Sequence, residues 1–276
     1  MKIIEALIEG RKYLEELEYT SPIYETRKIL SDLLNKDLSY LIAHDRDELD
    51  ESIEREYFEI LKKREMGIPL QYILGKEDFY GRTFKVLDGV LIPRQDTEIS
   101  VEKLLEIIKN NEVKNMLEIG CGSGIVSITI DLETDISITC VDISSFAIEN
   151  TKINKKLHNS NINILKSDLF ENVKGKFDLI YSNPPYIKTD EIDKLQIEVR
   201  EYEPRLALDG GSDGLIFYRK IIEKAPNYLR KGGFLVFEIG HDEANDIFKL
   251  MEKNFKVEVF KDLNSLDRVI LGQLEI

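Results

Sequence analysis

The chain has 276 residues, of which 42% are hydrophobic and 33% charged, enough for a sizeable core and for two domains or one large one. Its formal net charge of −14 argues against sequence-independent nucleic-acid binding, because phosphate contacts need clustered Lys and Arg. No stretch approaches the ~20 apolar residues of a membrane span, and the acidic residues of the amphipathic N-terminus argue against a targeting signal.

The first 75 residues are predicted to form a small helical bundle. Apolar residues recur at helical spacing between Ile3 and Leu17, and again in 20–36, which opens with Thr-Ser-Pro. Residues 38–50 are typical of a short helix and a loop, and 51–67 of a long helix that stops at a glycine. This part of the sequence contains no strand pattern.

A β-hairpin linker is predicted over residues 76–92. The segment alternates between apolar and polar residues and carries turn signals at Tyr80-Gly81 and Asp88-Gly89. We therefore place the boundaries of three parts at 1–75, 76–92 and 93–276.

From residue 93 onward, helices and strands are predicted to alternate. After a helix in 97–111 come apolar runs of strand length at 115–120, 137–142, 161–168, 177–183 and 233–240. Helical stretches lie between most of them, at 125–132, 144–158 and 215–229. The final runs, 255–262 and 268–275, are too close for a crossover helix. The pattern predicts an α/β fold with a mostly parallel, doubly wound sheet and an antiparallel C-terminal hairpin.

Ligands of such sheets bind at the carboxyl ends of the strands. The first strand ends in a loop whose glycines are Gly120, Gly122 and Gly124, and glycines let a backbone turn sharply and approach a ligand. The dinucleotide fingerprint would need glycine where Ile125 stands, and no P-loop Lys-Ser/Thr follows. Alone, this loop indicates either a tight turn or a binding site, and Cys121 within it is interpreted as a small filler residue.

Acidic residues end the next two strands. Asp142 lies ~20 residues beyond the glycines, where a ribose-binding carboxylate belongs, although it could also cap the helix that follows. Asp168 could accept a hydrogen bond from an adenine amine, with Leu169 and Phe170 near the ring, or it could cap a loop. Together with the glycine loop, these positions outline a nucleoside with a charged tail and no phosphate motif, for which S-adenosylmethionine is the natural candidate.

The fourth strand ends in Asn183-Pro184-Pro185-Tyr186. Two prolines cannot donate to a sheet ladder, so the strand must stop there. The turn is either a simple strand terminator or a rigid clamp that holds hydrogen-bond acceptors in fixed positions. The polar ends of the other strands favour the clamp.

These motifs resemble the class I, Rossmann-like methyltransferases, whose sheet has seven strands. The remaining motifs resemble the release factor glutamine methyltransferases of the HemK/PrmC type over nearly the whole chain. The motifs that carry this resemblance are PLQYILG, FYGRTFKV, VLIPRQDTE, LEIGCGSG, VDIS, SNPPYI, YEPRLALDGGSDGL and FEIG.

The resemblance implies methylation of the side-chain amide nitrogen (N5) of the glutamine in the Gly-Gly-Gln loop of class I peptide-chain release factors. S-adenosyl-L-methionine would be the methyl donor and S-adenosyl-L-homocysteine the product. The implied cofactor residues are Gly120, Cys121, Gly122, Ser123, Gly124, Asp142, Asp168, Leu169 and Asn183. The implied substrate residues are Asn183, Pro184, Pro185 and Tyr186, of which Asn183, Pro184 and Tyr186 would be catalytic. The helical bundle would dock the release factor.

Two alternatives remain open. An N6-adenine-type nucleic-acid methyltransferase uses a similar Asn-Pro-Pro motif, but it would need a basic groove or a target-recognition domain. A non-catalytic scaffold that binds S-adenosylmethionine would tend to have lost either the glycine loop or the Asn-Pro-Pro-Tyr turn.

The roles of several other polar residues stay open in the sequence. Glu118 could touch the methionine amino group or be structural, and Arg94, Asp96 and Glu98 could close the site or cap a helix.

Cys121 and Cys140 have no zinc or disulfide-framework spacing, so we predict reduced thiols and a cytoplasmic protein. The histidines, His44, His158 and His241, lie far apart in the sequence, and we predict no metal and no membrane partner.

Overall fold

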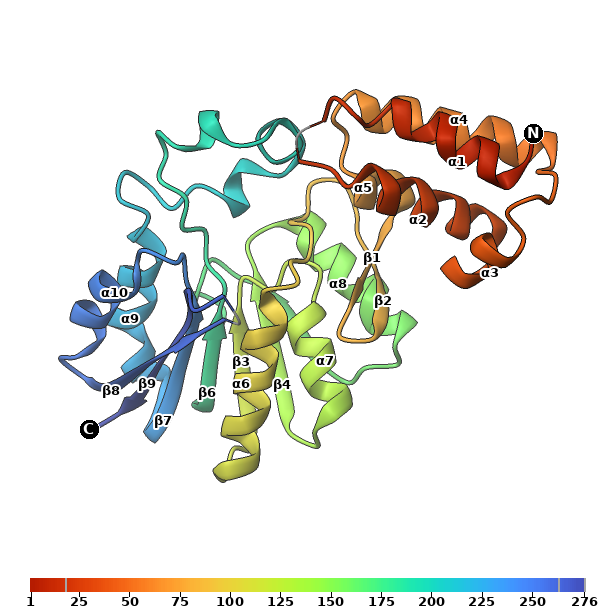
Figure 1. The fold of residues 1–276 in the computed structure, drawn as a ribbon. Helices are drawn as coiled ribbons and strands as arrows, with labels where there is room; N and C mark the ends of the chain where they lie inside the picture. The colour runs from red at the N-terminus through yellow and green to blue at the C-terminus, as the bar shows by residue number, and fades with distance from the viewer. Residues whose placement is uncertain (18, 263, 276) are drawn as a thin grey trace. The chain divides into compact units, whose positions relative to one another are not determined.

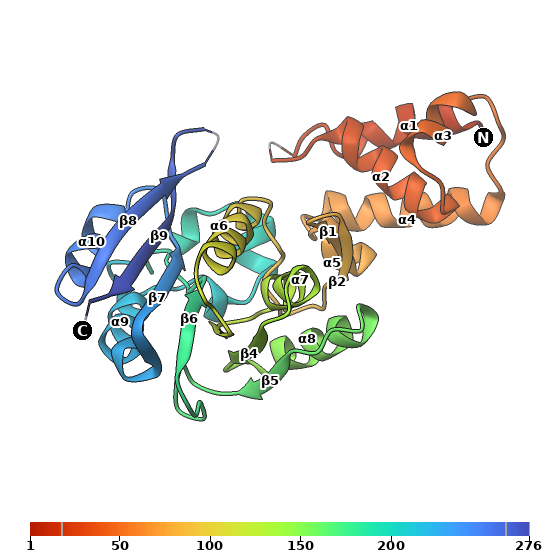
Figure 2. The same ribbon diagram turned by 90° about the horizontal axis from the view of Figure 1, so that it is seen from below.

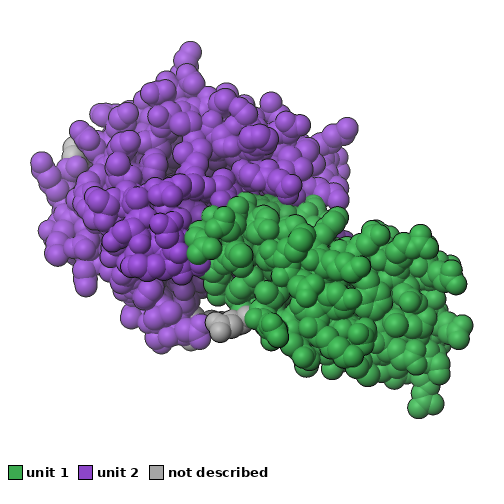
Figure 3. All heavy atoms as spheres, turned by 90° about the horizontal axis from the view of Figure 1, so that it is seen from above, with its two compact units in different colours: residues 1–75, 196–202 green, residues 76–195, 203–276 purple. Residues whose placement is uncertain are grey.

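A computed structural model describes residues 1–17, 19–262 and 264–275 (Figure 1). The chain divides into two compact units, coloured in Figure 3. Unit 1 comprises residues 1–75 and 196–202, and unit 2 comprises residues 76–195 and 203–276. None of the helices in the described ranges combines the length and the apolar composition that a bilayer crossing would need.

Unit 1 is the predicted helical bundle. Its helices are α1 (Ile3–Lys12), α2 (Pro22–Leu34), α3 (Leu38–Ala43), α4 (Glu51–Glu65) and α5 (Leu70–Leu74). Pro22 opens α2, where its missing N–H costs nothing, and Asn35 ends that helix in the left-handed conformation. At the start of α4, the Asp50 side chain accepts the Ser52 N–H at 2.8 Å. Apolar faces of these helices form one core that includes Leu30 and Leu61.

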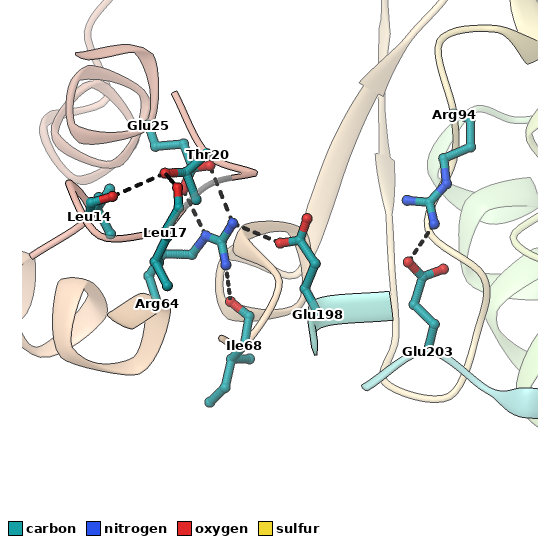
Figure 4. Close-up of polar contacts among 9 residues, drawn as sticks. All are labelled: Leu14, Leu17, Thr20, Glu25, Arg64, Ile68, Arg94, Glu198 and Glu203. Carbon is teal, nitrogen blue, oxygen red and sulfur yellow. Dashed lines mark hydrogen bonds and ion pairs between the residues drawn. The ribbon is translucent and has the colours of Figure 1, made fainter. Parts of the chain in front are cut away.

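An arginine buried in this bundle binds a segment from much later in the chain. The Arg64 side chain is 2% exposed, and its guanidinium donates to Glu25 Oε2 and to Glu198 Oε2, each at 2.7 Å (Figure 4). Glu198 begins a short π-helical turn, Glu198–Tyr202. In the same segment, the Tyr202 hydroxyl donates to the Met66 carbonyl oxygen at 3.2 Å. These contacts make residues 196–202 part of unit 1, which no sequence pattern indicated.

Unit 2 contains a two-stranded hairpin and a seven-stranded sheet. The hairpin pairs β1 (Lys76–Phe79) with β2 (Arg82–Lys85) in antiparallel register. The sheet strands are β3 (Asn115–Ile119), β4 (Ser137–Asp142), β5 (Asn163–Lys166), β6 (Phe177–Ser182), β7 (Leu229–Glu238), β8 (Phe255–Lys261) and β9 (Asp267–Leu274). Their spatial order is β5-β4-β3-β6-β7-β9-β8, and only the pairings of β9 are antiparallel. The predicted sheet and its antiparallel C-terminal hairpin are confirmed.

Helices cover both faces of the sheet (Figure 2). The helices of unit 2 are α6 (Thr97–Asn110), α7 (Ile125–Glu133), α8 (Ser145–Leu157), α9 (Ile216–Tyr228) and α10 (Ala244–Met251). Side chains alternate between the faces, as a pleated strand requires. Thus Leu117 packs with the α9 and α10 core, whereas its neighbour Met116 packs with α6 and α7. The predictions did not include α10 or the short helical turns between residues 192 and 207.

Candidate functional site

A cavity of about 340 Å³ opens in unit 2 at the carboxyl ends of the parallel strands. It lies at the topological switch point, where β3 has β4 on one side and β6 on the other. The predicted site residues that line it are Gly120, Gly122, Asp142, Asp168, Leu169, Asn183, Pro184 and Pro185. The fold therefore brings together side chains and backbone from four successive strand ends.

The glycine loop presents bare backbone to this cavity. Gly120 and Gly122 have φ values of 77° and 55°, which few residues other than glycine adopt. A Cβ on Gly122 would meet no atom within 4 Å, whereas one on Gly124 would lie 2.7 Å from Thr151 Cγ2. The loop thus leaves room for a ligand at Gly122 and packs tightly against α8 at Gly124.

Three residues predicted in this loop face away from the cavity. Cys121, Ser123 and Gly124 are not among the lining residues. The Cys121 thiol lies 3.5 Å from Thr151 Oγ1, and the Ser123 carbonyl oxygen accepts Asn154 Nδ2 at 2.9 Å. These contacts hold the loop on the side away from the cavity, and any contact of the three residues with a ligand would come from the backbone.

The Asp142 carboxylate joins the glycine loop to the start of α8. It accepts the Gly122 N–H at 3.0 Å and the Ser144 N–H at 2.8 Å, each with a different oxygen. Ser144 is itself the N-cap, since its hydroxyl accepts the Ala147 N–H. Burial raises the pKa of Asp142, and the backbone donors oppose this shift. The carboxylate is thus rigidly held at the cavity wall.

The third strand end supplies Asp168 and Leu169 to the cavity, but Phe170 lies elsewhere. Leu169 has a φ of 46°, in the left-handed region. Phe170 is 1% exposed and stacks on Tyr228, with ring centroids 4.4 Å apart. The expectation that Phe170 packs near a bound ring is wrong, because its side chain belongs to the core beneath the cavity.

Asn183 follows the last residue of β6 and stands at the cavity wall. Its Nδ2 atom donates to Glu238 Oε1 at 2.8 Å. Among the described residues, no donor is hydrogen-bonded to its Oδ1 atom. Pro184 is buried next to it, and Ser182 Oγ ties the strand end to the Ile119 carbonyl oxygen at 2.7 Å. An available amide oxygen is therefore carried on a stiff, well-anchored turn.

A glycine-rich segment braces this turn from outside the cavity. The Ile187 N–H donates to the Leu208 carbonyl oxygen at 3.0 Å, and the Gly210 N–H returns a bond to Ile187 at 2.8 Å. A Cβ on Gly210 would lie 2.7 Å from Tyr186 Cα, and one on Gly214 would lie 2.5 Å from the Tyr186 carbonyl oxygen. Glycine at both positions lets the two backbones approach this closely. The Tyr186 side chain does not line the cavity, and burial raises the pKa of its phenol to about 12.

The residues with open roles near the first helix of unit 2 make structural contacts. Arg94 forms an ion pair with Glu203 (Figure 4), and Asp96 one with Arg268 at 3.0 Å. Glu98 accepts the Tyr80 N–H at 2.7 Å. The pair of Arg94 with Glu203 joins the loop before α6 to the segment whose next residue, Pro204, lines the cavity.

Glu118 contacts α7 rather than the cavity. It accepts both the N–H, at 3.0 Å, and the hydroxyl of Ser127. Burial raises the pKa of Glu118 to about 8.

Cys121 and Cys140 are buried and free of disulfides. Within the described ranges, no three His, Cys, Asp or Glu side chains are grouped as metal ligands would be.

Two asparagines of α8 that were not predicted hold the cavity wall in place. Asn150 Oδ1 accepts the Leu87 N–H at 2.8 Å, and Asn154 Oδ1 accepts the Lys85 N–H at 2.7 Å. They fix the strand that leads into the wall segment 89–91. Two asparagines four residues apart on a helix share one face, and this spacing could have indicated them. Glu238 lies in the quoted FEIG motif but was given no role, because it meets Asn183 only when β7 pairs with β6.

Comparison with known proteins identifies the family. The PrmC N-terminal domain family matches residues 5–75, and the methyltransferase small domain family matches residues 83–200. A release factor glutamine methyltransferase of Clostridium acetobutylicum is 40% identical over 280 residues, covering 99% of this chain and 98% of that protein. One from Bacillus cereus is 36% identical and covers all of both chains.

Solved structures support the fold. A methyltransferase from Pyrococcus furiosus aligns with a TM-score of 0.54 at 20% identity, over 71% of this chain and 91% of that one. A T. thermophilus 16S rRNA methyltransferase, in complex with AdoMet and guanosine, aligns with a TM-score of 0.54 at 17% identity, over 72% of this chain and 50% of that one. Since its relatives match it from end to end, the chain belongs to the release factor glutamine methyltransferase family.

Proposed function

We propose that this chain transfers a methyl group from S-adenosyl-L-methionine to the side-chain amide nitrogen (N5) of the glutamine in the Gly-Gly-Gln motif of class I peptide-chain release factors. The proposal rests on similarity along the whole chain to proteins named release factor glutamine methyltransferase, together with an Asn-Pro-Pro-Tyr turn at the wall of a cavity. S-adenosyl-L-homocysteine is the other product.

The cavity residues fit the methyl donor. Gly120 and Gly122 leave space beside the backbone, as a ligand that lies along the loop requires. The Asp142 carboxylate can accept hydrogen bonds from the ribose hydroxyls. The Asp168 carboxylate can accept one from the exocyclic amine of the adenine, with the apolar Leu169 next to it in the chain. When bound, the cofactor supplies an electrophilic methyl group on a sulfonium sulfur.

The Asn183 turn would bind the glutamine amide. An amide nitrogen is a weak nucleophile, because its lone pair is delocalised into the carbonyl group. Two acceptors aimed at its two N–H bonds would orient it and direct electron density onto nitrogen, and we assign these roles to Asn183 Oδ1 and the Pro184 carbonyl oxygen. The prolines keep both acceptors in place, and Tyr186 supports the turn from outside the cavity. Positioning of this kind contributes ~7–11 kcal/mol in favourable cases. As the new N–C bond forms and the S–C bond breaks, the nitrogen becomes strongly acidic and releases its proton to solvent, so no strong base is needed.

Unit 1 is proposed to dock the release factor. Residues 5–75 match the N-terminal domain of the same family, so the bundle accompanies the catalytic unit in relatives of this name. The same full-length similarity favours a glutamine amide over a nucleobase as the acceptor.

Transfer of a labelled methyl group tests the function. The purified chain is incubated with radiolabelled S-adenosylmethionine and a class I release factor, beside a version of that factor with Ala in place of the Gly-Gly-Gln glutamine. We expect label in the first factor and none in the second. Label in DNA or RNA instead would point to a nucleobase acceptor, and label in no acceptor despite cofactor binding would point to a scaffold.

The brace behind the turn gives a further prediction. Gly214→Ala is expected to lower kcat by about 10²-fold, because a Cβ would lie 2.5 Å from the Tyr186 carbonyl oxygen and displace the turn. Gly175→Ala is the matched control, since Gly175 also has a positive φ, of 91°, but a Cβ there meets nothing within 4 Å. Equal losses in both variants would show that backbone strain, rather than the brace, matters.

A further inference from the structure

Glu238, the last residue of β7, is a buried carboxylate shared between the site and the core. It is 5% exposed. Its Oε1 atom accepts Asn183 Nδ2 at 2.8 Å, and its Oε2 atom accepts Ser100 Oγ at 3.2 Å and the Tyr181 hydroxyl at 3.3 Å. Burial raises the pKa of Glu238, and these hydroxyl donors oppose the shift.

The pairing of β6 with β7 brings Glu238 to Asn183. The parallel register sets Tyr181 opposite Val236 and Ser182 opposite Phe237, so the next pair along the two strands is Asn183 and Glu238. Tyr181 and Val236 both belong to the core on the α6 side of the sheet. Because side chains alternate, residues two positions further point to the same side. The strand register therefore brings the two side chains together, and Ser100 of α6 binds the other carboxylate oxygen of Glu238.

We infer that Glu238 is a positioning residue, which holds the Asn183 amide with its NH₂ group toward the core and its Oδ1 atom toward the cavity. An asparagine amide has nearly the same shape in either orientation, so packing alone does not choose between them. A carboxylate only accepts hydrogen bonds, and a reversed amide would set oxygen against oxygen. This inference rests on the proposed role of Asn183 Oδ1 as an acceptor for the substrate amide.

Two substitutions in the full chain test the inference. Glu238→Leu removes the acceptor and is expected to lower kcat by about 10- to 100-fold, as for outer partners that orient metal-ligating side chains. Glu238→Gln keeps the shape and one acceptor but permits both amide orientations, so a smaller loss is expected. The affinity for S-adenosylmethionine, measured by calorimetry, should stay unchanged in both.

A double-mutant cycle separates positioning from general support of the core. With Asn183→Ala already present, either change at Glu238 should lower single-turnover rates no further, because the side chain it orients is gone. Losses that multiply, or that appear as weaker cofactor binding, would overturn the inference. Should the Leu variant not fold, the Gln variant decides by the same cycle.

The outcomes also distinguish this inference from the proposal beneath it. Normal turnover of Asn183→Ala alone would rule out the two-acceptor clamp and, with it, the positioning role of Glu238. A slow Asn183→Ala enzyme beside fully active Glu238 variants would leave the clamp in place and overturn only the role of Glu238.

Discussion

Asn183→Ala is expected to reduce kcat by at least about 10²-fold, as when a single preorganised hydrogen-bonding group is removed from an active site. The variant loses the amide oxygen at the cavity wall but keeps both prolines. The cavity walls made by the glycine loop and Asp142 stay the same, so the dissociation constant of S-adenosylmethionine should change little. Methyl transfer to a release factor under saturating substrate measures the first quantity, and calorimetry the second.

The control for this experiment is Asn161→Ala, an exposed asparagine that does not line the cavity. It should retain the turnover of the unchanged chain. Near-normal turnover of Asn183→Ala would rule out the two-acceptor clamp. A loss confined to KM would instead assign Asn183 to substrate binding that is equal in the ground and transition states.

Arg64→Met is expected to lower the free energy of unfolding of unit 1 by about 3 kcal/mol. The substitution removes the guanidinium that Glu25 and Glu198 bind, and the side chains of these two residues are only 12% and 20% exposed. Removing one partner of a buried ion pair costs about 3–5 kcal/mol, and the residual exposure of both carboxylates places this case at the lower end. Urea unfolding followed by circular dichroism measures the change, since the chain has no tryptophan.

Arg55→Met is the matched control, because Arg55 lies on the same helix and is exposed. It should alter stability by less than about 0.5 kcal/mol. Adding Glu25→Gln and Glu198→Gln to Arg64→Met should recover part of the loss, since the two side chains that faced the guanidinium then carry no charge. Equal effects of the two arginine substitutions would mean that the ion pairs contribute nothing to unit 1.

The sheet of unit 2 was predictable because its strands carry local signals. β4 (Ser137–Asp142) has the predicted bounds, and β3 and β6 each end one residue earlier than predicted. Apolar runs of this length between amphipathic helices have few other solutions. β7 begins four residues before its predicted start, because Leu229 pairs with Phe177 across an irregularity in the register. Such an extension depends on the neighbouring strand and has no signal of its own.

The candidate site was predictable where its residues stand at strand ends. Asp142, Asp168 and Asn183 each follow an apolar run, and the fold collects them around one cavity. Glu238 also ends a strand, but its contact with Asn183 depends on the register of β7 beside β6. Similarly, the ion pair of Arg64 and Glu198 joins residues 134 positions apart. No local sequence pattern predicts contacts between residues so far apart in the chain.

Unit 1 is built from two separate segments of the chain, and this limits how domains can be exchanged between relatives. Residues 196–202 follow the Asn183 turn in sequence, yet they fold with the N-terminal bundle. A chimera that joins the first 75 residues of one relative to the remainder of another would place Arg64 from one parent against Glu198 from the other. Under the docking role proposed for the bundle, a transplant of substrate specificity should succeed only when residues 196–202 are transferred together with the bundle. In evolution, too, the two segments should be inherited as a single module despite their separation in the gene.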